Sequence, residues 1–222
     1  MPWATEGGGR TITGWAWAAL ALYGTWLFAA FGVRTVLQLR RTGDSGFRGL
    51  SGRPGSAAWW AGVLFAAALL GAVAAPVATL LGLPVLAEDV PALHAAGAAV
   101  TVLGIAATLT AQGAMGTSWR VGVDAAERTD LVTGGLFAHV RNPVFTAMGV
   151  TGLGLTLMVP NALSLAALTA LVVAVELQVR VVEEPYLRAV HGPAYLAYGA
   201  TAGRFVPGVG RLGAGTGNPE TG

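Results

Sequence analysis

The chain has 222 residues, of which 54% are hydrophobic and only 11% are charged, and its mean hydropathy is +0.63. Soluble domains usually carry about 25% charged residues, so this composition argues against an ordinary soluble protein and indicates a membrane protein. The formal net charge of +2 is too small and too scattered for a nucleic-acid surface, and the absence of cysteine excludes disulfides and thiolate chemistry. The histidines lie far apart without metal-ligand spacing, so no metal site is expected.

Apolar segments in chain order predict membrane helices, each of which needs about 20 mostly apolar residues to span a bilayer. The segments are 15–37, 57–83, 91–115, the shorter 144–159, and 162–182. The first is too long for a signal-peptide core of about 7 to 15 residues, so we expect it to be retained. Pro76 is expected to kink the second. The sequence therefore predicts an all-α integral membrane protein with about five transmembrane helices, the last two forming a tight hairpin with Asn161 as N-cap.

The arginines indicate the orientation of these helices. They gather in the connections after the first and third segments and in the tail, whereas the opposite connections carry Glu88 and Asp89 or no charge. Because cytoplasmic loops retain positive charge, this pattern predicts an outside N-terminus and a cytoplasmic C-terminus. We expect a bacterial inner-membrane protein whose polar segments, and any active site built from them, face the cytoplasm.

A first group of polar residues precedes the fourth segment, in LVTGGLFAHVRNP. Asn142 and Pro143 fit the N-cap and first position of a helix, and this local reading explains both residues. It does not explain His139 and Arg141 at the same place, nor the glycine pair before them. A helix N-terminus with Arg141 beside it suits a carboxylate or phosphate, so the segment is also a candidate anion site.

A second group, ELQVRVVEEPYL, ends the fifth segment. Its spacing puts Glu176, Arg180 and either Glu183 or Glu184 on one helical stripe. One interpretation is an ion pair between Glu176 and Arg180 with two solvated glutamates at the membrane surface. The other is a polar face toward a cavity, because ionisable groups inside an apolar helix are costly and usually have a functional partner. Both interpretations remain open at this level.

The order of LVTGGLFAHVRNPVF, a short helical hairpin, RVVEEPYL, HGPAYLAY and RFVP resembles the isoprenylcysteine carboxyl methyltransferase family. More broadly it is similar to the membrane methyltransferases that include phospholipid N-methyltransferases. The resemblance covers about residues 112–208. It implies S-adenosylmethionine as cofactor, in a cytoplasmic pocket formed by loop 116–143 and the C-terminal segment. We thus expect a substrate-side region (1–115), a methyltransferase core (116–208) and a disordered Gly-rich tail (209–222).

The resemblance also implies which residues form this pocket. Backbone groups of Leu131 and Val132 would contact the adenine, the glutamate pair would take ribose hydroxyls or the amino group, and two tyrosines would close the site. The implied cofactor-binding residues are Leu131, Val132, Gly135, His139, Arg141, Asn142, Pro143, Glu183, Glu184, Tyr195 and Tyr198. Two positions depart from the family pattern: Asn142 stands where the family has a histidine, and Thr201 stands near the place of an arginine. Asn142 cannot titrate, so a role of that histidine as base would be lost.

The implied reaction passes a methyl group to a lipophilic small molecule or lipidated substrate that arrives from the bilayer. A carboxylate acceptor would be oriented by Arg141 and Arg204, whereas an amine or thiol acceptor would need a base, for which Glu176 is the buried carboxylate we expect. Two alternatives remain: a membrane NAD(P)H-dependent reductase of the steroid-reductase type, whose C-terminal region is similar, and a helical bundle without enzymatic activity.

Overall fold

The computed structural model describes residues 6–45, 52–116 and 131–213, and these residues form a helical bundle. Its α-helices are α1 (Glu6–Leu27), α2 (Arg34–Thr42), α3 (Ala57–Leu80), α4 (Pro91–Met115), α5 (Pro143–Met158), α6 (Ala162–Leu177), α7 (Glu184–His191) and α8 (Pro193–Thr201). The described residues also form the π-helices η1 (Phe28–Val33) and η4 (Gln178–Glu183) and the 3-10 turn η3 (Gly135–Ala138). Extended pairing in the described ranges is a single parallel bridge between Val140 and Gly203, so the predicted all-α class is confirmed.

Two of the apolar segments are longer helices than the sequence predicts. The first helix continues from α1 through η1 into α2, and α6 continues through η4 into α7. Within the described residues, four helical stretches are long and apolar enough to cross a membrane: Thr11–Thr42, Ala57–Leu80, Pro91–Met115 and Ala162–His191. The fifth predicted span, α5, is an apolar helix of 16 residues. At 1.5 Å per residue it is about 24 Å long, which is shorter than the roughly 30 Å hydrocarbon core.

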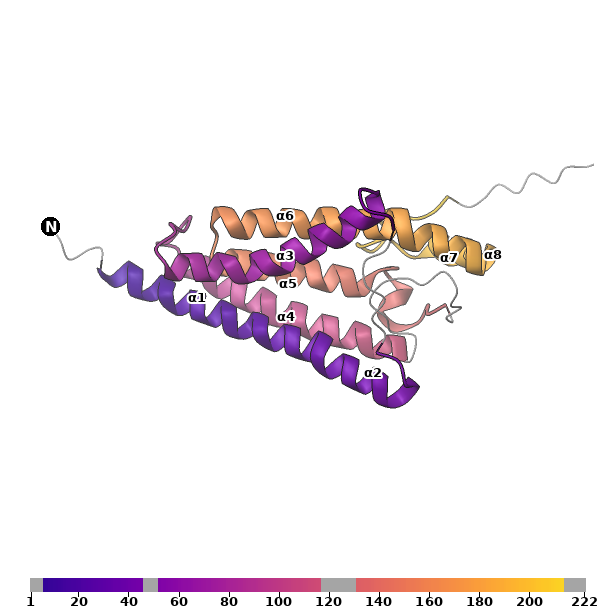
Figure 1. Cartoon of the computed structure of the whole chain (residues 1–222), viewed down its shortest axis with the longest axis horizontal. Helices are drawn as coiled ribbons and strands as arrows, with labels where there is room; N and C mark the ends of the chain where they lie inside the picture. The colour runs from indigo at the N-terminus through magenta and orange to yellow at the C-terminus, as the bar shows by residue number, and fades with distance from the viewer. Residues whose placement is uncertain (1–5, 46–51, 117–130, 214–222) are drawn as a thin grey trace, which may run out of the picture.

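The long helices lie side by side along the bundle axis (Figure 1). Although α5 and α6 are joined by a tight turn, α5 packs mainly against α4, and α6 packs mainly against α3. α1 contacts α3, α4 and α5 and so closes one side of the bundle. The end of α4, the start of α5, and helices α7 and α8 lie together at one end, which we call the α8 end.

Asn161 caps α6, as the sequence predicts, and also connects the hairpin to α3. Its Oδ1 accepts a hydrogen bond from the Ser164 backbone N–H (2.9 Å), which satisfies a donor at the helix start. Its Nδ2 donates to the Ala75 carbonyl (3.0 Å) and to Thr79 Oγ1 (2.9 Å). Pro76, the residue after Ala75, lies inside α3, and the helix continues through it without a break.

Glycines allow α4 and α5 to approach each other closely. A Cβ atom on Gly104 would lie 2.6 Å from the backbone nitrogen of Thr151, and one on Gly97 would lie 2.7 Å from that of Met158. A Cβ on Gly154 of α5 would lie 2.5 Å from the backbone nitrogen of Thr101. Such small-residue contacts are how membrane helices pack tightly when lipid provides no hydrophobic driving force.

Replacing Gly104 by Ala is therefore expected to destabilise the bundle. The added methyl group overpacks a backbone contact, which typically costs about 1–3 kcal/mol. Gly113→Ala is the matched control on the same helix, because nothing lies within 4 Å of its Cβ position. Thermal unfolding in detergent should show a lower Tm for Gly104→Ala and an unchanged or higher Tm for Gly113→Ala; equal Tm values would contradict the close packing.

Candidate functional site

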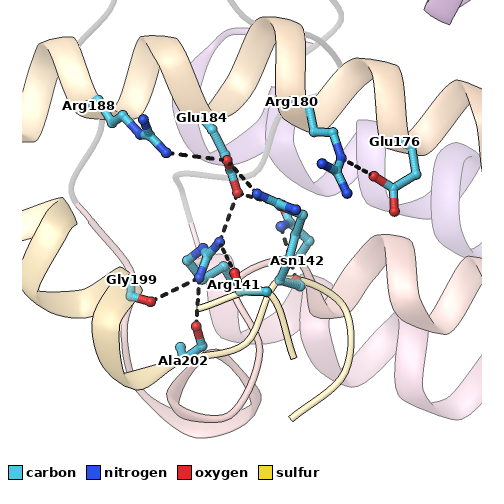
Figure 2. Close-up of polar contacts among 10 residues, drawn as sticks. Arg141, Asn142, Glu176, Arg180, Glu184, Arg188, Gly199 and Ala202 are labelled. Carbon is cyan, nitrogen blue, oxygen red and sulfur yellow. Dashed lines mark hydrogen bonds and ion pairs between the residues drawn. The ribbon is translucent and has the colours of Figure 1, made fainter. Parts of the chain in front are cut away.

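Glu184, the first residue of α7, links two distant arginines at the α8 end (Figure 2). Its Oε1 accepts hydrogen bonds from Arg141 Nη2 (2.8 Å) and Arg204 Nε (2.7 Å), and its Oε2 accepts from Arg204 Nη2 (3.1 Å). Glu184 is only 4% exposed, and Arg141 is also buried. We call Arg141, Glu184 and Arg204 the Glu184 joint. It connects the residue before the α5 N-cap, the start of α7 and the segment after α8.

Arg141 also holds the C-terminal segment through backbone carbonyls. Its Nη1 donates to the carbonyls of Gly199 (3.1 Å) and Ala202 (2.6 Å), and its Nη2 donates to that of Gly210 (3.0 Å). The Leu212 backbone N–H donates to the Gly199 carbonyl (2.8 Å). Through these contacts Gly210 and Leu212, at the beginning of the predicted tail, pack back onto the domain; residues 214–222 lie outside the described part of the chain.

Backbone pairing fixes the same two segments together. The Arg141 backbone N–H donates to the Gly203 carbonyl (2.8 Å), and the Gly203 N–H donates to the His139 carbonyl (3.0 Å). Gly203 has no room for a side chain, since a Cβ there would lie 2.9 Å from the Gly208 nitrogen. The glycine thus permits the tight turn that brings Arg204 to Glu184.

Asn142 is the N-cap residue of α5, but its side chain does not cap the helix. Instead its Nδ2 donates to the Arg204 carbonyl (3.1 Å), as does its backbone N–H (3.2 Å). One turn later, Thr146 Oγ1 donates to the Phe205 carbonyl (2.8 Å). The predicted positions of Asn142 as N-cap and Pro143 as first helical residue are therefore confirmed, but the side-chain amide binds the C-terminal segment to the first turn of α5 instead of capping the helix.

The two tyrosines of α8 pack against η3. The Tyr198 hydroxyl donates to the Phe137 carbonyl (2.7 Å), and the rings of Tyr195 and Tyr198 meet edge to face with centroids 6.3 Å apart. Burial raises the pKa of Tyr198 to about 12 and also raises the pKa of Tyr195, which is almost fully buried. Both hydroxyls are therefore protonated at neutral pH, and that of Tyr198 serves as a hydrogen-bond donor.

The remaining predicted cofactor residues differ in accessibility. Leu131, Val132 and Glu183 are half-buried, Gly135 and His139 are exposed, and Pro143 is buried at the start of α5. Residues 117–130 of the predicted loop lie outside the described residues.

Glu176, expected as a buried base, is not enclosed by the protein. Its side chain is 38% exposed and accepts a hydrogen bond from Arg180 Nε within the same helix. Figure 2 shows this pair on the same side of the helix as Glu184. The local ion-pair interpretation of these two residues is the one that the structure shows.

The joint carries excess positive charge, because the guanidinium groups of Arg141 and Arg204 share one carboxylate, and a third, that of the more exposed Arg188, lies 3.8 Å from Glu184 Oε2. The hydrogen bonds with Glu184 raise the pKa of Arg204, so this side chain stays charged. The joint is thus a cluster of ionic side chains with a net positive charge.

Within the described residues, no group of three or more His, Asp and Glu side chains is placed to hold a metal ion.

An apolar cavity of about 40 Å³ lies elsewhere, between α1, α3, α5 and α6. Tyr23 and Trp26 of α1, Leu155 of α5 and Leu171 of α6 contribute to its lining. It lies within the apolar part of the bundle rather than at the joint, and so offers room for apolar groups only.

Several contacts at the α8 end involve residues that no sequence pattern marks as functional. The carbonyls of Gly199, Ala202 and Gly210 bind Arg141 through backbone atoms, for which the residue type gives no clue. Arg34 and Gln112 are different, because a charged or amide side chain within an apolar span was visible in the sequence and was not singled out.

Comparison with known families agrees with the resemblance in these motifs. Residues 92–194 match the family model described as phospholipid methyltransferase. This part of the chain, a little under half of it, is thus similar to a family of membrane methyltransferases, which is related to the isoprenylcysteine methyltransferases. No curated protein matches the chain. Together with the four long apolar helices of the described residues, the match indicates an integral membrane protein, and the matched family is one that acts on lipophilic substrates.

Glu184→Gln is expected to destabilise the protein strongly. The substitution keeps the shape of the side chain but leaves the buried Arg141 without its charge partner, and breaking a buried pair in this way costs about 3–5 kcal/mol. Glu176→Gln is the control, because exposed pairs contribute only about 0.3–0.5 kcal/mol. Thermal unfolding in detergent should separate the two variants clearly; similar small shifts would show that the joint is not a structural requirement.

Alkaline pH is expected to loosen the contact between α8 and η3. The pKa of Tyr198 is raised from 10.0 to about 12 in the folded protein, so its contribution to stability is complete below pH 10 and is lost as the pH rises through 12. In Tyr198→Phe this part of the pH dependence should disappear. The measurement is unfolding temperature against pH for both proteins; identical curves would contradict the assignment.

Proposed function

We propose that this chain is an S-adenosylmethionine-dependent methyltransferase that methylates an amphiphilic acceptor at the cytoplasmic surface of the membrane. The observation that carries the proposal is the Glu184 joint. It gathers, at one end of the bundle, the three segments that also carry the family resemblance. Arg204 lies ten residues beyond the matched residues 92–194, so the proposed unit extends to the C-terminal segment.

The residues at the α8 end fit S-adenosylmethionine, which when bound supplies a methyl group activated by a sulfonium. The excess positive charge of the joint suits the carboxylate of the cofactor's amino-acid part. Glu183, half-buried and next to the joint, suits a ribose hydroxyl or the ammonium group. Leu131 and Val132, which are both half-buried, offer backbone groups and apolar surface. The chemistry of this donor set therefore matches the polar and apolar parts of the cofactor.

The hydrogen bonds divide the predicted residues into two roles. Arg141, Glu184 and Arg204 bind one another and backbone carbonyls, so we assign them as positioning residues that hold the walls of the site. The half-buried Glu183 and the exposed His139 are the side chains we assign to direct contact. This division accounts for a methyl transfer in which the protein mainly orients two molecules and excludes water.

The acceptor is proposed to reach the site from the bilayer. A carboxylate acceptor is nucleophilic at neutral pH and needs only a cation to orient it. An amine or thiol acceptor must first lose a proton. Glu176 then serves as the base, since its side chain is 38% exposed and can be reached from outside the bundle.

The distribution of charge supports a cytoplasmic position for the α8 end. α2, which carries Arg40, and the segments before α3 and after α8, which carry Arg53 and Arg211, lie at or near this end. The connection between α3 and α4, which carries Glu88 and Asp89, lies at the opposite end. This arrangement follows the excess of arginine on the cytoplasmic side of membrane proteins.

Calorimetry on the detergent-solubilised protein tests the cofactor assignment. Wild type is expected to bind S-adenosylmethionine, and Glu183→Gln is expected to weaken binding about tenfold, the size of one lost charge-assisted hydrogen bond. Glu88→Gln, an exposed carboxylate at the opposite end, should bind like wild type. Stabilisation by NADPH without binding of S-adenosylmethionine would instead favour the reductase alternative.

Incubation with methyl-labelled S-adenosylmethionine and a membrane lipid extract identifies the acceptor. The label is expected in an extractable amphiphile and not in the aqueous fraction. A folded protein that binds neither cofactor would reject an enzymatic role at this site.

A further inference from the structure

The apolar cavity lies where two closely packed pairs of helices meet. Within the pairs the helices leave little room: a Cβ on Gly104 of α4 would lie 2.6 Å from the backbone nitrogen of Thr151 of α5, and one on Gly71 of α3 would lie 2.8 Å from the Cβ of Ala167 of α6. The space of about 40 Å³ remains between these pairs, with α1 beside it. It therefore results from how the pairs face each other and not from one poorly packed side chain.

The polar groups in the lining of the cavity already have partners in the protein. The hydroxyl groups that donate to backbone carbonyls are those of Tyr23, Thr151, Thr156 and Ser164. The indole N–H of Trp26 donates to Thr108 Oγ1 (3.4 Å). The other lining residues are Ala, Gly, Leu, Met, Pro and Val. Since a buried polar group without a partner is costly, this lining favours a hydrocarbon over a polar ligand.

The size of the cavity limits its occupant to part of a hydrocarbon chain. An apolar cavity of about 150 Å³ admits a benzene ring. The space of about 40 Å³ here is much smaller, so it takes a few methylene groups and excludes a ring system. A chain end in this position gains dispersion contacts that the lining of an empty cavity lacks. The fitting ligand is thus the end of an unbranched chain whose remainder lies outside the cavity.

Three half-buried phenylalanines connect the cavity with the α8 end: Phe65 of α3, Phe145 of α5 and Phe205 after α8. We call them the phenylalanine seam. They pack against a cluster that includes Ala68 and Leu171, and these two residues also line the cavity. At its other end the seam reaches the Glu184 joint, because Phe205 directly follows Arg204. An apolar surface therefore extends from the joint to the cavity.

Helix geometry gives the chain length that reaches the cavity. α6, η4 and α7 form one continuous helix, in which Leu171 lies at the end of the cavity lining that is nearer to Glu184. From Leu171 to Glu184 the helix extends about 20 Å at 1.5 Å per residue. An extended hexadecyl chain is about as long as this distance, whereas a dodecyl chain is clearly shorter. With its head group at the joint, only the longer chain places its end in the cavity.

We propose that the apolar cavity holds the end of the acceptor's hydrocarbon chain, while the chain lies along the phenylalanine seam and the head group lies at the Glu184 joint. The acceptor is then a long, unbranched, single-chain amphiphile that enters the half-buried seam from the bilayer. The identification of this amphiphile as the acceptor rests on the proposed methyltransferase function. Binding of the chain does not need S-adenosylmethionine and is measured without it.

Calorimetry of the full-length protein in a neutral detergent tests this inference with dodecanoic and hexadecanoic acid, which share a carboxylate head group. Ala72→Leu fills the cavity from α3. Filling about 40 Å³ of apolar space corresponds to about fivefold in affinity, so this variant should weaken the binding of hexadecanoic acid about fivefold. Its affinity for dodecanoic acid should equal that of wild type. Each acid is compared with itself, so its partition into micelles cancels.

Ala74→Leu is the matched control, because it makes the same substitution at an exposed position of the same helix. Both affinities should stay unchanged in this variant. Equal weakening by Ala72→Leu and Ala74→Leu would show general lipid contact along α3 and would overturn the proposal. A higher Tm for Ala72→Leu with unchanged affinity for hexadecanoic acid would show a void that stays empty, and would also overturn it. If Ala72→Leu does not fold, the smaller Ala72→Val carries the same comparison.

Two further comparisons separate the parts of the proposal. Hexadecanol lacks the charged head group, so binding as tight as that of hexadecanoic acid would reject the position of the head group at the joint. Wild type that shows the predicted chain-length effect but does not bind S-adenosylmethionine would overturn the proposed function alone. Wild type that binds S-adenosylmethionine, with equal affinities for hexadecanoic acid in wild type and Ala72→Leu, would overturn the chain site alone.

Discussion

The carboxylate of Glu184 is the interaction on which the organisation of the α8 end depends. Burying a charge is costly, so Arg141, Glu184 and Arg204 can remain out of solvent only while they stay together. Their association fixes the residues before α5, the start of α7 and the segment after α8 in one arrangement. The carbonyls bound by Arg141 extend this arrangement to residue 210. A site made from sequence-distant segments thereby obtains a rigid frame.

The membrane-spanning part satisfies a different constraint, because lipid offers no water to unsatisfied polar groups. Gly104 and Gly154 bring α4 and α5 into backbone contact, and Asn161 satisfies polar groups of both α6 and α3. These contacts hold together the helices that carry the polar residues of the site. Among the described residues a few buried polar atoms have no hydrogen-bond partner, including Gln112 Oε1 of α4 and Arg141 Nε.

Asn142, which stands where the resembled family has a histidine, makes a structural contact in this chain. The amide of Asn142 donates to the Arg204 carbonyl, and so reinforces the pairing that brings Arg204 to Glu184. An N–H donor is all that this contact requires, and a histidine ring could supply one as well. The loss of a titratable ring at this place is therefore compatible with the frame of the site, and proton transfer, where the acceptor needs it, falls to another side chain.

Much of the architecture follows from local sequence alone. The length of the apolar segments determines the long helices, and Asn161 after Pro160 determines the hairpin, because capping and helix length depend on neighbouring residues. The order of motifs predicted the family to which residues 92–194 are similar. Only the tertiary structure decided the partners: that Arg141 meets Glu184 and three carbonyls, that Glu176 stays at the surface with Arg180, and that Arg34 donates to the Gly116 carbonyl at the end of α4. An arginine looks the same in a sequence whether its guanidinium group binds a ligand or a carboxylate of the protein. Which of the two it binds depends on contacts between residues far apart in the chain.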